Sequence, residues 1–277
     1  HPGYSGRMDD IVLPDGEMAI PLIGLRDLPA FSVVNVDGTA AMQLVCDHAS
    51  NLVPAALADL GLDDGLLDRH IGYDIGAAQV TRLLAKSLDA QAILAGYSRL
   101  VIDLNRPPGH SESISEISDQ IPIPGNRNLS EPEQNRRLTD LFEPYHGAIT
   151  EALAHLWRRG MPPALFSVHS FTPIFGDEDR PWDVGVLWNR DPRIAKPLMD
   201  KLKAKGLNVG NNLPYSGQDL AYTINIHGGA SGLANCVVEI NQDQVRDQAG
   251  LERWAGILTD VMGDILVMKD IHEVREY

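Results

Sequence analysis

The sequence predicts a three-layer α/β fold, in which a mixed, mostly parallel sheet of about eight strands lies between layers of helices. Short apolar runs alternate with amphipathic stretches along the chain, which is the pattern of strand–helix units around a parallel sheet. The 277 residues include 44% hydrophobic and 22% charged side chains, as is ordinary for a globular protein. No repeat or flexible linker divides the chain, so we expect a single domain over residues 1–277.

The expected strands are short apolar segments, rich in Val, Ile and Leu, that are bounded by polar or turn-forming residues. Segments of this length and composition are typical of strands buried on both faces of a sheet. We expect strands at residues 42–47, 91–96, 100–104, 164–169, 183–188, 220–226 and 235–240.

Apolar residues recur at helical spacing in four stretches, which cover residues 76–88, 131–157, 191–206 and 243–268. Ser130 stands at the N-cap position of the second stretch, with Glu133 at the capping-box position. Gly206 ends the third stretch, as glycine commonly does at helix ends. The longest irregular region, residues 107–128, is rich in Ser, Pro, Gly and Asn, and we expect it to be an active-site loop.

The charge balance argues against polyanionic partners. The 38 acidic residues outnumber the 23 basic ones, and the formal charge of −15 should repel nucleic acids and anionic membrane surfaces. No apolar run approaches the roughly 18 residues that span a bilayer. We therefore expect a soluble, cytoplasmic protein that binds a small molecule, and an anionic substrate would have to be held by local arginines.

Two further expectations concern the cysteines and the start of the chain. Cys46 and Cys236 each lie in an apolar run, which favours buried free thiols over a disulfide. Residues 1–7 have neither the charged nor the apolar region of a secretory signal. We expect these seven residues to be a disordered start or a cloning remnant.

Three of the expected strands end in a residue that can bind a metal or move a proton, namely His48, His169 and Glu239. In an open parallel sheet, ligands bind at the carboxyl ends of the strands, so these side chains can converge there. A lone histidine after a strand is more often a structural residue. The three together point to a shared site, because their runs contain almost no other ionisable group.

The third ligand of such a site stays open between an amide and a carboxylate. Asn51 lies three positions after His48, a spacing at which two side chains can reach one ion. An amide oxygen is a poor zinc ligand. Either Asn51 binds weakly, or it positions substrate, or another carboxylate such as Asp74 or Asp47 completes the set. Asp74 can equally be the N-cap of the helix that follows it.

Candidate substrate-binding residues lie around the segment 99–106. On the expected strand, Arg99, Asp103 and Asn105 would share one face, and Arg106 would follow at its end. An arginine beside a metal can hold a carboxylate with two hydrogen bonds or stabilise an oxyanion. The alternative is a solvated ion pair on an edge strand. Arg127, in the long loop, is either a further contact to a substrate carboxylate or an exposed loop charge.

Six segments together resemble the N-formylglutamate amidohydrolase family, in the same order and over nearly the whole chain. They are VCDHASN, HIGYDIGA, RLVIDLNRP, IPGNRNLS, SVHSFTP and CVVEINQD. That family is distantly similar to zinc carboxypeptidases and aspartoacylase. The resemblance implies a zinc-carboxypeptidase-like sheet, a single zinc, and hydrolysis of an N-acyl amino acid such as N-formylglutamate by a zinc-activated water.

The resemblance also implies roles for individual residues. His48 and His169 would be zinc ligands, and Glu239 would be the general base and acid. Asn105 and Arg106 would contact substrate or the developing oxyanion. Asn51 stands where the wider superfamily's His-x-x-Glu motif has glutamate. This departure motivates a second hypothesis, a non-catalytic binding protein on a decayed hydrolase fold, and a third keeps a hydrolase but for other N-acyl amino acids or peptide ends.

Overall fold

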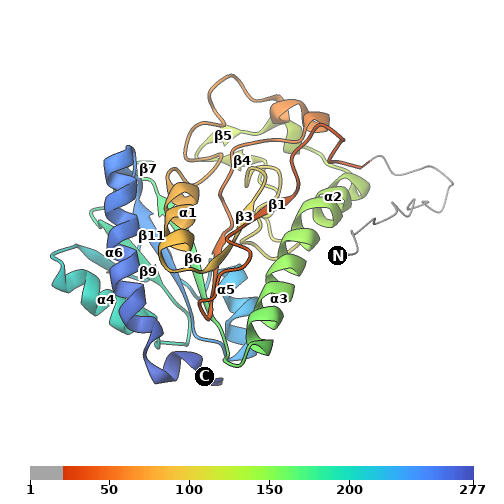
Figure 1. Ribbon diagram of the computed structural model, residues 1–277. Coiled ribbons are helices and arrows are strands. Elements are labelled where there is room, and N and C mark those ends of the chain that lie inside the picture. Colours follow the sequence, from red (N-terminus) through yellow and green to blue (C-terminus); the bar gives the residue numbers. More distant parts are fainter. Residues whose placement is uncertain (1–20) are drawn as a thin grey trace.

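A seven-stranded sheet forms the centre of the computed structural model, which describes residues 21–277 (Figure 1). The strand order is β1-β3-β2-β6-β11-β9-β10. The four central strands are parallel, β1 is antiparallel to β3 at one edge, and β9 runs antiparallel to β11 and carries β10 at the other. The strands are β1 (Phe31–Val34), β2 (Met42–Cys46), β3 (Gln91–Ala95), β6 (Ala164–Phe171), β9 (Val184–Leu187), β10 (Val209–Asn211) and β11 (Asn235–Asn241).

Helices cover both faces of this sheet, which gives the three layers that the sequence predicts (Figure 1). One face is covered by α1 (Ala77–Ser87), α4 (Ala195–Ala204) and α6 (Gln248–Leu266), and the other by α3 (Glu143–Arg158) and α5 (Tyr222–His227). Alternation along β2 explains how one strand serves both layers, because Leu44 packs toward the first face and Val45 toward the second. The mixed, mostly parallel sheet flanked by helices is therefore confirmed, with seven strands in place of about eight.

The helical stretches follow the predicted periodicity. Residues 131–157 form α2 (Glu131–Arg137) and α3, joined by a π-helical turn at Leu138–Phe142. The capping box of Ser130 and Glu133 is present, and Gly206 has the positive φ of 81° that favours glycine after a helix. Short hairpins and 3₁₀ turns complete the chain: β4 (Ile117–Ser118), β5 (Ile121–Pro122), β7 (Ile174–Phe175), β8 (Glu178–Asp179), and turns at Ala55–Gly61, Pro124–Asn126, Gly229–Ser231, Gln242–Gln244 and Lys269–His272.

Two predicted strands are wrong. Residues 100–104 form turns, in which the Val101 N–H donates to the Ser98 carbonyl and the Asp103 N–H to Ser113. Their apolar side chains are still buried beneath the long loop, so hydrophobicity marks burial there and not a strand. Residues 220–226 mostly form α5 instead. Strands β1 and β10 were not expected from the sequence.

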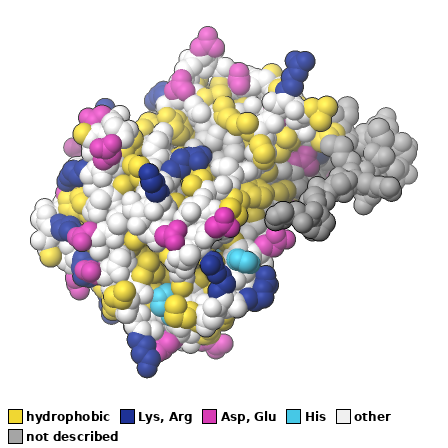
Figure 2. All heavy atoms as spheres, in the orientation of Figure 1, with side chains coloured by type: hydrophobic (Ala, Val, Ile, Leu, Met, Phe, Trp, Pro, Cys, Tyr) yellow, Lys and Arg dark blue, Asp and Glu magenta, His cyan; other side chains and the backbone are white. Residues whose placement is uncertain are grey.

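Cys46 and Cys236 are buried free thiols, as expected. The expectation about residues 1–7 lies outside the described residues. Among residues 21–277, no helix combines the length and apolar character that crossing a bilayer requires. On the face seen in Figure 2, basic side chains are scattered among acidic and polar ones and form no continuous cationic patch.

Candidate functional site

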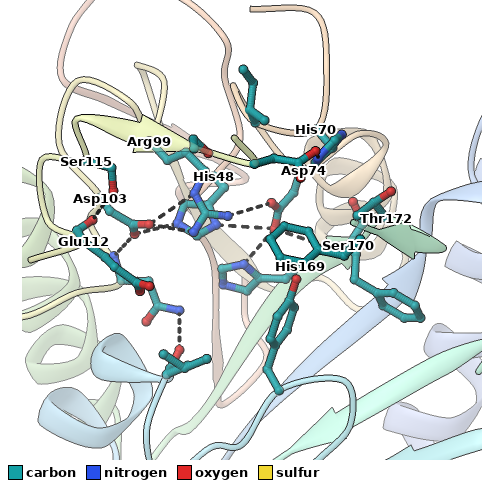
Figure 3. Close-up of a pocket in the computed structure, with 18 of the residues that line it drawn as sticks. His48, His70, Asp74, Arg99, Asp103, Glu112, Ser115, His169, Ser170 and Thr172 are labelled. Carbon is teal, nitrogen blue, oxygen red and sulfur yellow. Dashed lines mark hydrogen bonds and ion pairs between the residues drawn. The ribbon is translucent and has the colours of Figure 1, made fainter. Parts of the chain in front are cut away.

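A cavity of about 320 Å³ opens at the carboxyl ends of the central parallel strands (Figure 3). Ligand sites in open α/β sheets lie at this edge. The predicted residues His48, His169 and Glu239 all line the cavity. So do Arg99, Asn105 and Arg106, although the segment that carries them is a chain of turns and not a strand. The volume is at the low end of the range of small-molecule sites.

Strand register fixes two of these side chains beside one another. Glu239 of β11 is the direct partner of His169 of β6 in the parallel ladder, so both side chains point to the same face. Glu239 is only 7% exposed, and its Oε2 is buried without a hydrogen-bond partner among the described residues. Burial raises the pKa of Glu239 to about 7, against the opposing effect of His169. The carboxylate can therefore hold or release a proton near neutrality.

His48, Asp74 and His169 form the one group in the described chain that has the composition and spacing to hold a metal ion. Asp74 Oδ2 lies 2.8 Å from His169 Nδ1 and 3.4 Å from His48 Nδ1, and all three side chains are buried (Figure 3). His48 Nδ1 makes no hydrogen bond within the described protein. Two imidazole nitrogens and a carboxylate oxygen are the donors that zinc prefers, so these residues fit a zinc ion.

The far nitrogen of each histidine is held by a carboxylate. His48 Nε2 lies 2.7 Å from Asp103, and His169 Nε2 lies 2.8 Å from Asp47. Metal-bound histidines almost always donate their second N–H to such a partner, which fixes the ring and the tautomer. If Nε2 carries the proton in both rings, both Nδ1 atoms are free to bind a cation beside Asp74. The carboxylates that hold the two Nε2 atoms therefore also favour a metal site.

Asp47 is in turn surrounded by donors. It accepts hydrogen bonds from Tyr145 (2.9 Å), Thr223 (2.8 Å), Ser167 (3.2 Å) and His169. Although burial alone would raise the pKa of Asp47, these hydrogen bonds and the two histidines lower it to about 2. The same carboxylates act on His169: burial disfavours its charged form, but its hydrogen bonds to Asp47 and Asp74 raise its pKa well above the usual value. A positive charge between these carboxylates is therefore stabilised.

Arg99 lies beside two carboxylates of the site. Its guanidinium lies 2.7 Å from Asp103 and 3.7 Å from Asp74, so it is paired with both carboxylates. Burial of Asp103 would raise its pKa, yet Arg99 and His48 hold that pKa well below the ordinary value. Asp103 consequently stays ionised, joining Arg99 to His48.

Arg106 and Asn105 occupy the neighbouring wall of the cavity. The Asn105 amide accepts from the Thr223 N–H at 3.0 Å and donates to the Leu220 carbonyl at 3.2 Å, so it joins this segment to the start of α5. Arg106 donates to Glu112 at 2.9 Å. Glu112 is 55% exposed, and ion pairs of this kind are weak. A substrate carboxylate could therefore replace Glu112 at Arg106.

Two candidates lie away from the cavity. The Asn51 amide donates to Asp68 at 2.8 Å, and Asn51 is not among the lining residues. Arg127 is exposed and is likewise absent from the lining. Asp74, the carboxylate weighed against Asn51, lies with the histidines, and its side chain does not cap α1, whose N-cap is Gly76.

The long loop contributes one wall of the cavity, as expected for an active-site loop. Ser115, Ile117 and Asp119 line it, and Asp119 pairs with His70 at 3.0 Å across the opening. The sequence did not predict the residues that donate hydrogen bonds to Asp47. Tyr145 and Thr223 lie in helices, where nothing in the spacing marks them as polar partners of a strand end.

A known protein family and several solved structures are similar to this chain. A family model described as N-formylglutamate amidohydrolase matches residues 41–246. A gene product of Agrobacterium tumefaciens of known crystal structure is 32% identical, with a TM-score of 0.86 over 88% of this chain and 98% of that one. N-formylglutamate amidohydrolase from Ralstonia eutropha shares the fold at 20% identity, with a TM-score of 0.65 over 86% of this chain and 98% of that one. No curated protein matches the chain significantly. Because the family model covers well over half of the sequence, this chain belongs to the N-formylglutamate amidohydrolase family.

Proposed function

We propose that this protein is a zinc-dependent amidohydrolase that cleaves an N-formyl amino acid such as N-formylglutamate to formate and the free amino acid. The observation that carries the proposal is the meeting of His48, Asp74 and His169 in a cavity that Glu239 also lines, its Oε2 without a hydrogen-bond partner among the described residues. A metal centre beside a carboxylate that can take up a proton is the arrangement that hydrolysis of an amide requires.

The two histidines and Asp74 would hold the zinc ion, with Asp47 and Asp103 orienting the rings. When bound, zinc would supply Lewis acidity toward the formyl oxygen and lower the pKa of a neighbouring water. Glu239 would take the proton from the attacking water and deliver it to the amine nitrogen as the C–N bond breaks. One water is consumed, and formate and an amino group are released.

Arg106 would hold the α-carboxylate of the substrate. Its present partner Glu112 is exposed and comes from the long loop, so exchange for a substrate carboxylate costs little. The buried position of Arg106 strengthens its attraction for an anion compared with a surface arginine. Asn105 supports Arg106 through the start of α5, and Arg99 contributes by keeping Asp103 ionised.

The rival hypothesis of a non-catalytic binding protein rested on Asn51. Because Asp74 supplies a carboxylate beside both histidines, an amide at position 51 does not argue against metal binding. We therefore propose an enzyme and not a non-catalytic binding protein.

A panel of N-formyl, N-acetyl and N-carbamoyl amino acids tests the reaction. We expect the zinc-loaded protein to release formate from N-formyl amino acids, and N-formylglutamate to be among the substrates. Metal content should be measured on the same sample. If a fully zinc-loaded protein hydrolyses no member of the panel, the proposed reaction is wrong.

Loss of a carboxylate that orients a histidine ring should weaken zinc binding. Asp103→Asn and Asp47→Asn should each weaken zinc affinity by about 10–100-fold, because loss of the partner frees the ring and its tautomer. Competition with a chelator of known zinc affinity measures the change. Asp119→Asn is the matched control, since Asp119 also pairs with a histidine at the cavity but lies away from the metal group. Equal zinc affinity in all three variants would contradict the assigned role of Asp47 and Asp103.

A further inference from the structure

Arg180 is a buried cation with unused hydrogen-bonding capacity at the edge of the catalytic cavity. It is 6% exposed, and its Nε is buried without a partner in the described chain. The only hydrogen bond of its guanidinium to a described residue runs from Nη1 to the Tyr215 hydroxyl, at 2.7 Å. By contrast, the buried Arg193 has Asp191 and several carbonyl oxygens as acceptors. A buried charge without an anion is costly, so Arg180 calls for an explanation.

The surroundings of Arg180 connect it to the cavity. Its guanidinium carbon lies 4.8 Å from the ring centroids of both Phe175 and Tyr215, so two aromatic side chains hold it in place. Both rings line the cavity together with Glu239. In the described chain, no ion pair joins Arg180 to Glu178 or Asp179 of the adjacent hairpin strand β8, and its guanidinium donates to Tyr215 alone.

Tyr215 connects Arg180 to the cavity, because its hydroxyl contacts the guanidinium and its side chain lines the cavity. Its hydroxyl oxygen accepts from Arg180, and its own hydrogen has no acceptor among residues 21–277. A phenol that accepts from a guanidinium is polarised and becomes a better donor. The free O–H therefore suits an anionic acceptor that arrives with the substrate.

We propose that Tyr215, positioned and polarised by Arg180, binds the side-chain carboxylate of an acidic N-acyl amino acid. The α-carboxylate, which all such substrates share, goes to Arg106. A second carboxylate then needs a second cation, and Arg99 is already paired with Asp74 and Asp103. Arg180 is a specificity-determining residue that acts through Tyr215. This inference rests on the proposed hydrolase function, because it assigns a specificity-determining role to residues at the edge of the same site.

Three substrates distinguish the binding of the side-chain carboxylate from that of the α-carboxylate. N-formylglutamate has both, N-formylglutamine lacks the side-chain charge, and N-formyl-4-aminobutyrate lacks the α-carboxylate. For Arg180→Met and Tyr215→Phe, we expect kcat/KM to fall by about 10–100-fold for N-formylglutamate and N-formyl-4-aminobutyrate, the effect of one charge-assisted hydrogen bond. For N-formylglutamine the change should stay within about threefold. Tyr215→Phe keeps the ring against Arg180, so it tests the hydroxyl even if Arg180→Met folds poorly.

Arg246→Met is the matched control, because Arg246 is an exposed arginine outside the cavity lining and already pairs with Asp243. It should change no substrate ratio. Equal losses for all three substrates, or a loss on N-formylglutamine but not on N-formyl-4-aminobutyrate, would overturn the assignment.

Calorimetric binding of glutamate and glutamine to the zinc-loaded wild type and variants gives a readout that needs no turnover. Wild type should prefer glutamate, and both variants should lose that preference. If no substrate is hydrolysed but this pattern holds, the proposed reaction fails and the carboxylate site stands. If substrates are hydrolysed but the wild type shows no preference for glutamate, the proposed carboxylate site is wrong and the proposed reaction stands.

Discussion

Glu239→Gln should lower kcat by about 10²–10⁴ while the protein keeps its fold and its zinc. Glutamine preserves the size and shape of the side chain but cannot carry a proton between water and the leaving amine. The register of β11 against β6 places this carboxylate beside His169, and its Oε2 has no partner in the described protein that would be lost. The expected defect is therefore in proton transfer and not in stability or metal binding.

Steady-state kinetics on N-formylglutamate, with zinc content and thermal melting recorded on the same samples, measures this effect. Glu116→Gln is a suitable control because Glu116 is an exposed carboxylate of the long loop and does not line the cavity. Near-normal kcat in a zinc-loaded Glu239→Gln protein would remove Glu239 from the reaction and require another base.

Asp74→Ala and His169→Ala should each leave the protein without stoichiometric zinc after dialysis. Each change removes one of the donor atoms of the metal group, so the loss should exceed the roughly 10–100-fold that follows from losing an orienting partner. Plasma emission spectroscopy of the dialysed protein gives the metal content, and circular dichroism reports whether the variant is folded.

Asn51→Ala and His155→Ala serve as controls for these variants. Asn51 donates to Asp68 away from the cavity, and His155 lies exposed on α3, so both proteins should retain zinc. Zinc bound normally by a folded Asp74→Ala protein, together with zinc lost in Asn51→Ala, would return Asn51 to the position of third ligand.

The parts of the fold and site that the sequence predicts are those that regular strands determine. Apolar runs with a polar residue at the end identified β2, β6 and β11, and parallel strands necessarily bring their carboxyl ends to one edge. His48, His169 and Glu239 therefore share the cavity as expected. The alternation of side chains along a strand fixes which face each one takes.

The parts that were missed depend on contacts between distant loops. Residues 100–104 are as apolar as a strand, but turns held by Ser98 and Ser113 bury them without a strand partner. Asp74 lies before a helix, where an N-cap is equally reasonable, and only tertiary contacts bring it to His169. Arg180 gave no signal in the sequence, because its significance lies in what surrounds it in space.

Zinc removal and restoration on one sample tests the central claim most directly. Protein stripped by a chelator should lose hydrolysis of N-formylglutamate, and adding zinc back should restore activity in proportion to occupancy, up to one ion per chain. His169→Ala treated in the same way should regain neither metal nor activity. Undiminished hydrolysis by metal-free protein, or full restoration in His169→Ala, would contradict the assignment of this cavity as a zinc-dependent catalytic site.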